Sequence, residues 1–181
     1  MSENPILRLT CAYRFAAQAH VDEKRKGERG EPYINHLVEV ADMVARATDG
    51  SDVDLVVAAL LHDTVEDTKV TAEDLSREFG ARVASLVAEV TDDKSLPQAE
   101  RKRLQVEHAP HLSRDAQIIK LADKTSNVRD IIASPPKGWS AERRADYVAW
   151  ARQVVDICRP ASPMLSALFD EAVGRAPSRK D

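Results

Sequence analysis

Aromatic residues make up only 4% of the 181 residues, and the chain contains just two cysteines. Cys11 and Cys158 lie far apart and form no C-x-x-C pattern, which argues against a disulfide framework and against a zinc ribbon. We expect both to be buried as small hydrophobic side chains. No segment approaches the ~20 apolar residues of a membrane span, and the first residues lack the features of a signal peptide. We therefore expect a cytoplasmic protein with no membrane partner.

The chain also lacks an excess of positive charge. It has 26 Lys and Arg residues against 30 Asp and Glu residues, a net charge of −4, so we expect no binding to nucleic acid through a basic surface. Hydrophobic residues make up 43% and charged residues 31%, which allows a core under a well-solvated surface and argues against disorder.

Apolar residues recur with helical period along most of the chain, and no strand-like alternation or internal repeat is present. Capping residues and prolines divide the chain into helical segments. We predict an all-α helical bundle of about eight to ten helices, in which residues 1–181 form a single domain and residues 174–181 are frayed. The predicted helices cover residues 5–20, 34–45, 52–66, 71–79, 83–90, 98–108, 116–132, 140–158 and a short segment from 162.

The stretch "AALLHDTVEDT" places an imidazole and three carboxylates after an apolar run. On one continuous helix, His62 would lie next to Glu66 and Asp63 next to Asp67, because residues four apart share a face. Neighbouring carboxylates repel each other, and desolvating each one costs several kcal/mol. A cation among these side chains would remove both costs, so the pattern indicates a metal site.

Two more side chains extend this pattern. His36 follows "PYIN" at the start of a predicted helix, and Asp123 lies in "IIKLADKTSN", again at the end of an apolar run. Two imidazoles and two carboxylates form a donor set that suits Mn²⁺, with Fe²⁺ or Zn²⁺ possible, and that leaves coordination positions open for water and substrate. The alternative is a solvated helix end, since His-Asp dipeptides are common. We expect the remaining histidines, His20, His108 and His111, at the surface or at helix ends.

Four motifs resemble one family. "HD" after an apolar helix, with an upstream His and a downstream Asp, resembles the HD-domain metal phosphohydrolases. "RKGERGEPYINHLVEVA", "AALLHDTVEDT", "FGARVASLVAEVTDDKSLP" and "KLADKTSNVRDI" resemble the hydrolase domain of RelA/SpoT-type alarmone proteins and its stand-alone versions, the small alarmone hydrolases. "PPKGWSAERRADYVAWARQVV" resembles the tail of the metazoan-type stand-alone enzymes. The resemblance covers nearly the whole chain and implies an HD-domain fold without synthetase or regulatory domains.

The resemblance also implies an activity, the Mn²⁺-dependent hydrolysis of the 3′-pyrophosphate of (p)ppGpp to GDP or GTP and pyrophosphate. By motif position, Glu66 would activate the attacking water as a general base, and Asp67 would position the water or a ligand. The implied metal ligands are His36, His62, Asp63 and Asp123.

The resemblance further assigns Arg25, Lys26, Asn127 and Tyr147 to nucleotide binding. A polyanionic substrate needs local cations, which we predict in the cluster Lys24, Arg25, Lys26 and Arg29 and beside Asp123 in Lys120, Lys124 and Arg129. The alternative for the first cluster is a solvated loop. For Arg101, Lys102 and Arg103 we expect a solvated helix face.

This chain departs from the family pattern at three places. Leu37 replaces the proline that usually follows the first metal histidine, Thr125-Ser126 replaces a Leu-aromatic or Leu-His pair, and Gln98 stands where relatives often carry a lysine. The second departure alters packing or the nucleotide wall. Two alternatives therefore stay open: hydrolysis of another nucleotide, such as removal of the 2′-phosphate of NADPH, or a non-catalytic nucleotide sensor.

Overall fold

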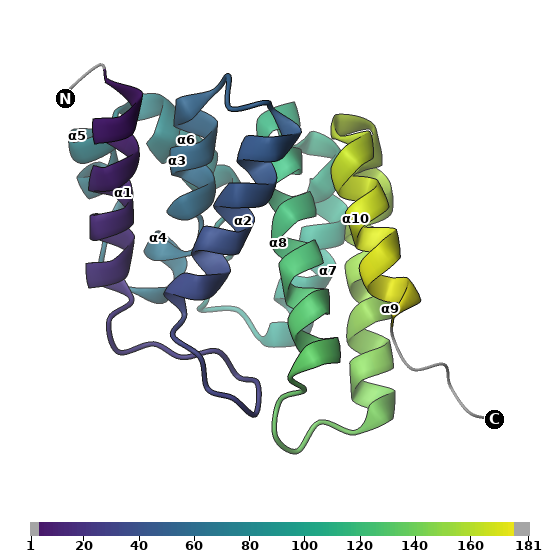
Figure 1. The fold of residues 1–181 in the computed structure, drawn as a ribbon. Helices are drawn as coiled ribbons and strands as arrows, with labels where there is room; N and C mark the ends of the chain where they lie inside the picture. The colour runs from purple at the N-terminus through teal and green to yellow at the C-terminus, as the bar shows by residue number, and fades with distance from the viewer. Residues whose placement is uncertain (1–3, 176–181) are drawn as a thin grey trace.

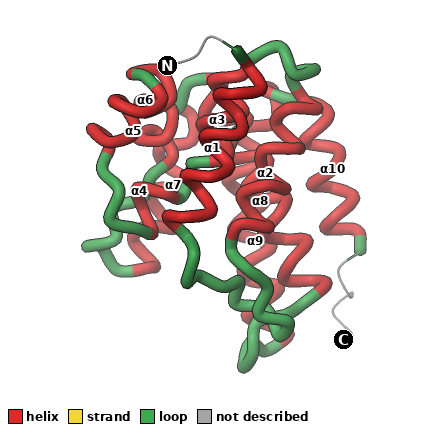
Figure 2. Tube along the Cα trace, turned by 60° about the vertical axis from the view of Figure 1, so that its left-hand side comes forward, coloured by secondary structure: helices red, strands yellow, loops and turns green. Residues whose placement is uncertain are grey.

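The computed structural model describes residues 4–175. Within them it contains ten α-helices, two short 3-10 helices and two isolated β-bridges, and no strand (Figure 2). The all-α prediction is confirmed. The helices are α1 (Pro5–Ala19), α2 (Ile34–Ala47), α3 (Val53–Leu60), α4 (Thr64–Asp67), α5 (Ala72–Phe79), α6 (Ala81–Val90), α7 (Gln98–His108), η1 (Ala109–His111), α8 (Arg114–Ala133), α9 (Ala141–Cys158), η2 (Arg159–Ala161) and α10 (Pro163–Gly174).

The helix starts follow the capping residues of the sequence. The side chain of Asn4 accepts hydrogen bonds from the first turn of α1, and the Asp52 side chain accepts one from the Leu55 amide of α3. Thr71 and Asp74 form both hydrogen bonds of the predicted capping box at α5. Each cap satisfies backbone donors that a helix start leaves without an intrahelical partner.

Helix α8 is the central element of the bundle. It packs against α2, α6, α9 and α10 and lies among them in Figure 1. Most of its length is buried, including Ile119, Leu121 and Val128, and also the polar Asp123. A polar group buried on a core helix needs a partner nearby, so this helix carries both the packing and part of a candidate site.

The predicted continuous helix over residues 52–66 is wrong. Helix α3 ends at Leu60, residues 61–63 form a turn, and α4 is a single further helical turn. The Thr64 amide donates to the Leu61 carbonyl at 2.9 Å, and His62 Nδ1 lies 2.8 Å from the Ala59 carbonyl oxygen. These local contacts replace the continuous helical hydrogen bonds, so a shared helix face does not place His62 and Asp63.

Two loops meet at one end of the bundle, residues 20–33 between α1 and α2 and residues 134–140 between α8 and α9 (Figure 1). An isolated bridge joins Gly27 to Pro136, and the Glu28 amide donates to the Pro135 carbonyl at 3.2 Å. A Cβ atom on Gly27 would lie 2.5 Å from the Ser134 backbone oxygen. Glycine at this position therefore permits the two loops to approach.

Several expectations about the surface can be checked. Cys158 is buried, as expected, but Cys11 is exposed on α1. His20, expected at the surface or at a helix end, is the C-cap residue of α1 and is buried. His108 and His111 are exposed.

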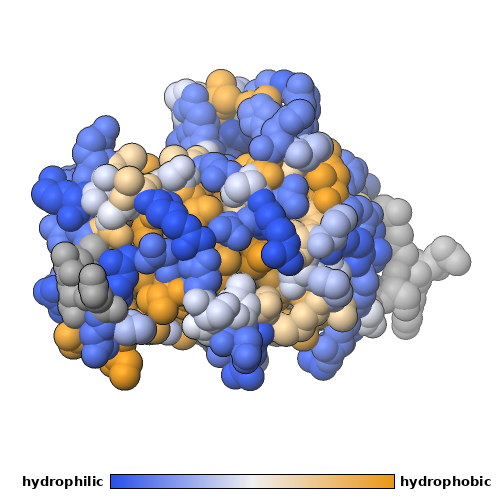
Figure 3. Space-filling view, turned by 90° about the horizontal axis from the view of Figure 1, so that it is seen from above, coloured by the Kyte–Doolittle hydropathy of each residue, from blue (hydrophilic) through white to orange (hydrophobic). Residues whose placement is uncertain are grey.

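In residues 4–175 we find no helix with the length and apolar character needed to cross a membrane. The face seen in Figure 3 is largely hydrophilic, with small apolar areas between charged side chains. Of the segment expected to fray, Gly174 ends α10, and residues 176–181 lie outside the described residues.

Candidate functional site

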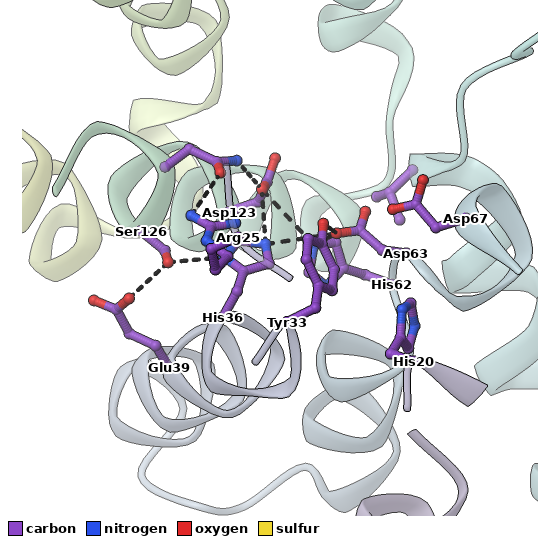
Figure 4. Close-up of polar contacts among 12 residues, drawn as sticks. His20, Arg25, Tyr33, His36, Glu39, His62, Asp63, Asp67, Asp123 and Ser126 are labelled. Atoms are coloured by element: carbon purple, nitrogen blue, oxygen red, sulfur yellow. Dashed lines mark hydrogen bonds and ion pairs between the residues drawn. The ribbon is translucent and has the colours of Figure 1, made fainter. Parts of the chain in front are cut away.

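Three elements bring His36, His62 and Asp123 together. His36 lies in the first turn of α2, His62 in the turn between α3 and α4, and Asp123 in the middle of α8. One ligand atom from each lies within 4.8 Å of the other two, and all three residues are buried (Figure 4). Asp123 Oδ1 lies 3.4 Å from His36 Nε2 and 3.7 Å from His62 Nε2.

The carboxylate of Asp63 joins this group. Its Oδ2 atom lies 3.1 Å from His62 Nε2 and 3.5 Å from His36 Nε2. The four side chains that the sequence analysis singles out as metal ligands therefore converge, although they come from distant parts of the chain.

The hydrogen bonding of the two imidazoles fits a metal ion. Each Nδ1 atom has an acceptor, Ser126 Oγ at 2.8 Å for His36 and the Ala59 carbonyl for His62. Each Nε2 atom is buried and has no hydrogen-bond partner within the described residues. Buried polar nitrogens are rarely left unpaired, and a divalent cation between the two nitrogens and two carboxylates would complete both.

The local charges favour a cation at this point. Burial by itself would lower the pKa of His62, yet Asp63 and Asp123 raise it to about 10. Burial would raise the pKa of both carboxyl groups, but His62 beside Asp63 and Lys124 beside Asp123 hold them well below the ordinary value of 3.8. The centre is thus strongly anionic in character and stabilises positive charge.

Glu66 and Asp67 of α4 stand next to the metal centre. Glu66 accepts a hydrogen bond of 3.0 Å from the Asp92 amide, and burial raises the pKa of its carboxyl group. Asp67 is ion-paired with Lys94 from the loop before α7. Glu66 and Asp67 line one cavity together with Asp63 and Asp123. A carboxylate of raised pKa beside a metal centre is suited to accept a proton.

Two adjoining cavities open at this site. One, of about 320 Å³, contains the carboxylates named above, and the other, of about 430 Å³, lies between the two loops. Lys26, Tyr33, Asn127 and Tyr147 line both cavities. Together they offer a cleft in which one ligand can reach the metal centre and the loops at the same time.

Arg25 and Asn127 connect the loop cavity to the metal centre. Arg25 is ion-paired with Asp130 and donates a hydrogen bond of 3.1 Å to Asn127 Oδ1. Asn127 in turn donates to Asp123. The Arg25 guanidinium also lies 5.7 Å from the centre of the Tyr33 ring. Internal contacts therefore hold Arg25, which the sequence analysis assigns to the nucleotide, against one wall of the cavity. Lys26 is exposed.

Lys120 and Lys124 line the cavity of the metal centre and are buried. Lys120 donates to the Val90 carbonyl at 2.7 Å. Lys124 donates to Asp123 Oδ2 at 2.7 Å, and its Nζ atom lies 4.9 Å from the centre of the Trp150 ring. Each ammonium group therefore already uses part of its hydrogen-bonding capacity on a contact within the protein.

Two further cations belong to this site, although no sequence pattern marks them. Arg101 and Lys102 were expected on a solvated face, but both line the cavity of the metal centre, and Arg101 Nη1 lies 3.7 Å from Glu66 Oε1. Arg103 is exposed, as expected. Helix α7 carries few apolar residues, chiefly Leu104 and Val106, so no periodicity marks the face that carries Arg101 and Lys102.

Aromatic side chains of the site were missed as well. Tyr33 donates a hydrogen bond of 2.6 Å to Asp63 Oδ2, and its place in "PYINH", three residues before His36, is the signal that would have found it. Trp139 lines the loop cavity, with its ring 5.9 Å from that of Tyr147. Burial raises the pKa of Tyr147 to about 12, so its phenol keeps its proton.

The positions that depart from the family pattern have separate places. Leu37 is part of the core, and Gln98 lines both cavities. Thr125 and Ser126 are buried, and among the described residues neither belongs to the lining of these two cavities. Ser126 instead contacts His36, so this departure lies beside the candidate metal ligands and outside the lining of the two cavities.

A family profile described as "HD domain" matches residues 12–152. The chain belongs to the HD-domain family. Within that family it is 54% identical to guanosine-3′,5′-bis(diphosphate) 3′-pyrophosphohydrolase MESH1 of Danio rerio over 141 residues, 78% of each chain. It is 52% identical to the MESH1 protein of Homo sapiens over 148 residues, 82% of this chain and 83% of that protein.

A bacterial protein and a protein of known structure are also similar to this HD-domain protein. It is 35% identical over 171 residues to the bifunctional (p)ppGpp synthase/hydrolase SpoT of Escherichia coli, which covers 91% of this chain but 23% of SpoT. A solved structure described as a metazoan ortholog of SpoT that hydrolyzes ppGpp has a TM-score of 0.89 and 42% identity, covering 93% of this chain and 94% of that one. The resemblance inferred from the motifs is confirmed.

Proposed function

We propose that this HD-domain protein hydrolyses the 3′-pyrophosphate of (p)ppGpp, with GDP or GTP and pyrophosphate as products. The names of its relatives support this activity, since those with 54% and 52% identity are both called guanosine-3′,5′-bis(diphosphate) 3′-pyrophosphohydrolases. We also propose that residues 1–181 act as one hydrolase domain, because the described helices share a hydrophobic core.

The observation that carries the proposal is the convergence of His36, His62, Asp63 and Asp123, with both Nε2 atoms left without a hydrogen-bond partner among the described residues. These four side chains would hold the ion, and their two nitrogen and two oxygen donors lead us to propose Mn²⁺ over Zn²⁺ or Fe²⁺. When bound, the ion supplies Lewis acidity toward phosphoryl oxygens and water.

Glu66 and Asp67 would do the proton chemistry. Glu66 is half-buried beside the metal centre, where burial raises the pKa of its carboxyl group and makes it a better proton acceptor. We assign it as the general base that takes a proton from the attacking water. Asp67, held by Lys94, would position that water or a ligand.

The nucleotide would occupy both cavities. Its phosphate groups would lie near Lys120 and Lys124, whose ammonium groups line the cavity of the metal centre, and near Lys26 at its edge. The loop cavity offers Arg25 and Tyr147 to the nucleoside. A polyanion bound in this way is compatible with the net charge of −4, because the cations gather at the site.

The test is pyrophosphate release from ppGpp by the purified protein. We expect release that requires Mn²⁺, stops with EDTA and returns when Mn²⁺ is added back. An absence of pyrophosphate release at every Mn²⁺ concentration would reject the proposal. The same assay with NADPH tests the first alternative, hydrolysis of another nucleotide. Comparable turnover of NADPH and ppGpp would show that the site is not specific for alarmones. A protein that binds ppGpp tightly but never turns it over would be a sensor.

A further inference from the structure

A chain of hydrogen bonds runs from the metal centre to the surface. Nδ1 of His36 lies 2.8 Å from Ser126 Oγ, and the Ser126 hydroxyl donates to Glu39 Oε2 at 2.6 Å. Arg129 Nη1 donates to the other oxygen of Glu39 at 2.9 Å. Figure 4 shows Glu39, Ser126 and His36 in line, on the side of the imidazole away from Asp63.

The protons in this chain can be assigned from the chemistry of its members. An ionised carboxylate only accepts hydrogen bonds, so Ser126 must give its single hydroxyl proton to Glu39. The oxygen of Ser126 is then free to accept, and the proton between it and His36 belongs to Nδ1. This assignment leaves the lone pair of His36 on Nε2, the atom that faces Asp63 and Asp123.

We propose that Glu39 and Ser126 are positioning residues, which fix His36 in the Nδ1–H tautomer and thereby set the affinity of the centre for a divalent cation. The inference rests on the proposed function of His36 as a metal ligand. Arg129 holds Glu39 in place through the ion pair. A hydrogen-bonded carboxylate behind a metal-binding imidazole raises the basicity of the ligand nitrogen, and losing such a partner typically weakens metal binding about 10–100-fold.

The two histidines of the centre differ in the partner that holds Nδ1. His62 Nδ1 is held by the backbone carbonyl of Ala59, which no side-chain substitution removes. His36 depends on two side chains from different helices, Glu39 on α2 and Ser126 on α8. Ser126 is only 1% exposed, whereas the side chain of Glu39 is 37% exposed. The chain therefore connects a half-exposed ion pair to the buried centre.

The competing explanation is that Glu39, Ser126 and Arg129 only join α2 to α8. Under that explanation, removing them lowers the free energy of unfolding but leaves the metal affinity of the folded protein unchanged. Ion binding and the position of the imidazole proton must therefore be measured directly, apart from catalysis.

The experiment measures the Kd of Mn²⁺ alone by isothermal titration calorimetry on Ser126→Ala, Glu39→Ala and the double variant. We expect Kd to rise about 10–100-fold in each single variant. We expect little further rise in the double variant, because both substitutions break the same chain. Asp42→Ala is the matched control: Asp42 is an exposed α2 carboxylate ion-paired with Arg46, so its loss should leave Kd unchanged. Circular dichroism verifies that each variant is folded.

A second measurement locates the imidazole proton. Nitrogen-15 NMR of histidine-labelled protein loaded with Zn²⁺, which is diamagnetic, should show the proton of His36 on Nδ1 and slow to exchange with solvent. Exchange should be faster in Ser126→Ala. The inference is overturned if the proton lies on Nε2, or if folded Ser126→Ala and Glu39→Ala bind Mn²⁺ as tightly as the wild type. Wild-type protein that binds neither ion would instead reject the proposed metal centre itself.

Discussion

The phenol of Tyr33 donates a hydrogen bond to Asp63 Oδ2, the oxygen that also lies 3.1 Å from His62 Nε2. Burial, followed by the nearby Asp63, raises the pKa of Tyr33, so the phenol stays a donor at any physiological pH. The Tyr33 ring is stacked on His20, with ring centres 5.3 Å apart, which restricts its orientation. Tyr33 therefore supports the second carboxylate of the centre, just as Ser126 supports the first histidine.

We expect Tyr33→Phe to weaken Mn²⁺ binding about 10-fold or more, because it removes the hydrogen bond that orients Asp63 and keeps the ring. Calorimetric titration of Mn²⁺ measures this change. Tyr13→Phe is a suitable control, since Tyr13 is 38% exposed on α1 and should not affect the ion. Equal affinities for Tyr33→Phe and the wild type would mean that Asp63 needs no support from the phenol.

Glu66→Gln should lower kcat for ppGpp about 10²–10⁴-fold, since the amide cannot accept the proton from water. The same variant should bind Mn²⁺ with the affinity of the wild type, because Glu66 is not among the four converging ligands. Initial rates of pyrophosphate release and a Mn²⁺ titration separate the two effects. Glu73→Gln, on the exposed face of α5, should keep full activity. Wild-type turnover by Glu66→Gln would remove Glu66 from the mechanism.

Gly27→Ala should destabilise the protein by about 1–3 kcal/mol, because the new Cβ would fall 2.5 Å from the Ser134 backbone oxygen and 2.6 Å from its hydroxyl. It should also raise KM for ppGpp, as both loops line the larger cavity. Urea unfolding and steady-state kinetics measure the two effects. Gly174→Ala should cause no loss, since a Cβ there would point into open space. Unchanged stability in Gly27→Ala would show that the loops can separate freely.

Arg82 should contribute to stability in a pH-dependent way. It donates to Asp52 at 2.7 and 2.6 Å and to Asp115 at 2.8 Å, and its hydrogen bonds lower the pKa of Asp52 below the ordinary value of 3.8. A carboxyl group whose pKa is lowered by folding stabilises the protein above its unfolded-state pKa, and this stabilisation is lost as pH falls through the folded-state pKa.

We therefore expect Arg82→Gln to lower the free energy of unfolding at pH 7 by up to about 1 kcal/mol, and the difference from wild type to narrow below pH 3.8. Urea unfolding at a series of pH values measures it. Arg46→Gln removes the exposed pair with Asp42 within one helix and serves as the comparison. A difference that stays constant down to the lowest pH would point to lost packing of the arginine side chain.

Local sequence signals were enough for much of this molecule. The capping box of Thr71 and Asp74 was predictable because its partners lie three residues apart. Convergence of His36, His62, Asp63 and Asp123 was predictable from the motifs, since each residue stands at a recognisable place beside an apolar segment. The break after Leu60 was not, because the apolar run through Leu61 has the same pattern in a helix and in a buried turn.

Contacts between distant segments could not be read from the sequence. Ser126 lies next to Asn127 in the chain, so the sequence suggested the nucleotide wall, yet on α8 its side chain turns to His36 and Glu39, some 90 residues away. The position of Arg101 in the cavity was likewise not predictable, because α7 has no clear apolar face that would show which side packs inward. Both outcomes depend on which side of a helix packs inward, and that is decided by the other helices.

The burial of α8 has a consequence for how such a protein can change. Asp123 and Ser126 share this helix with side chains of the hydrophobic core, so substitutions that adjust the metal centre also disturb the scaffold. Most positions of the loops at residues 20–33 and 134–140 are less constrained, because only His20 and Ser134 are buried there. Gly27, which permits the loops to approach, and Tyr33, which is hydrogen-bonded to Asp63, are the exceptions. Variation in substrate preference can accumulate in these loops while the centre stays fixed, which makes them the natural targets for directed evolution toward other nucleotides.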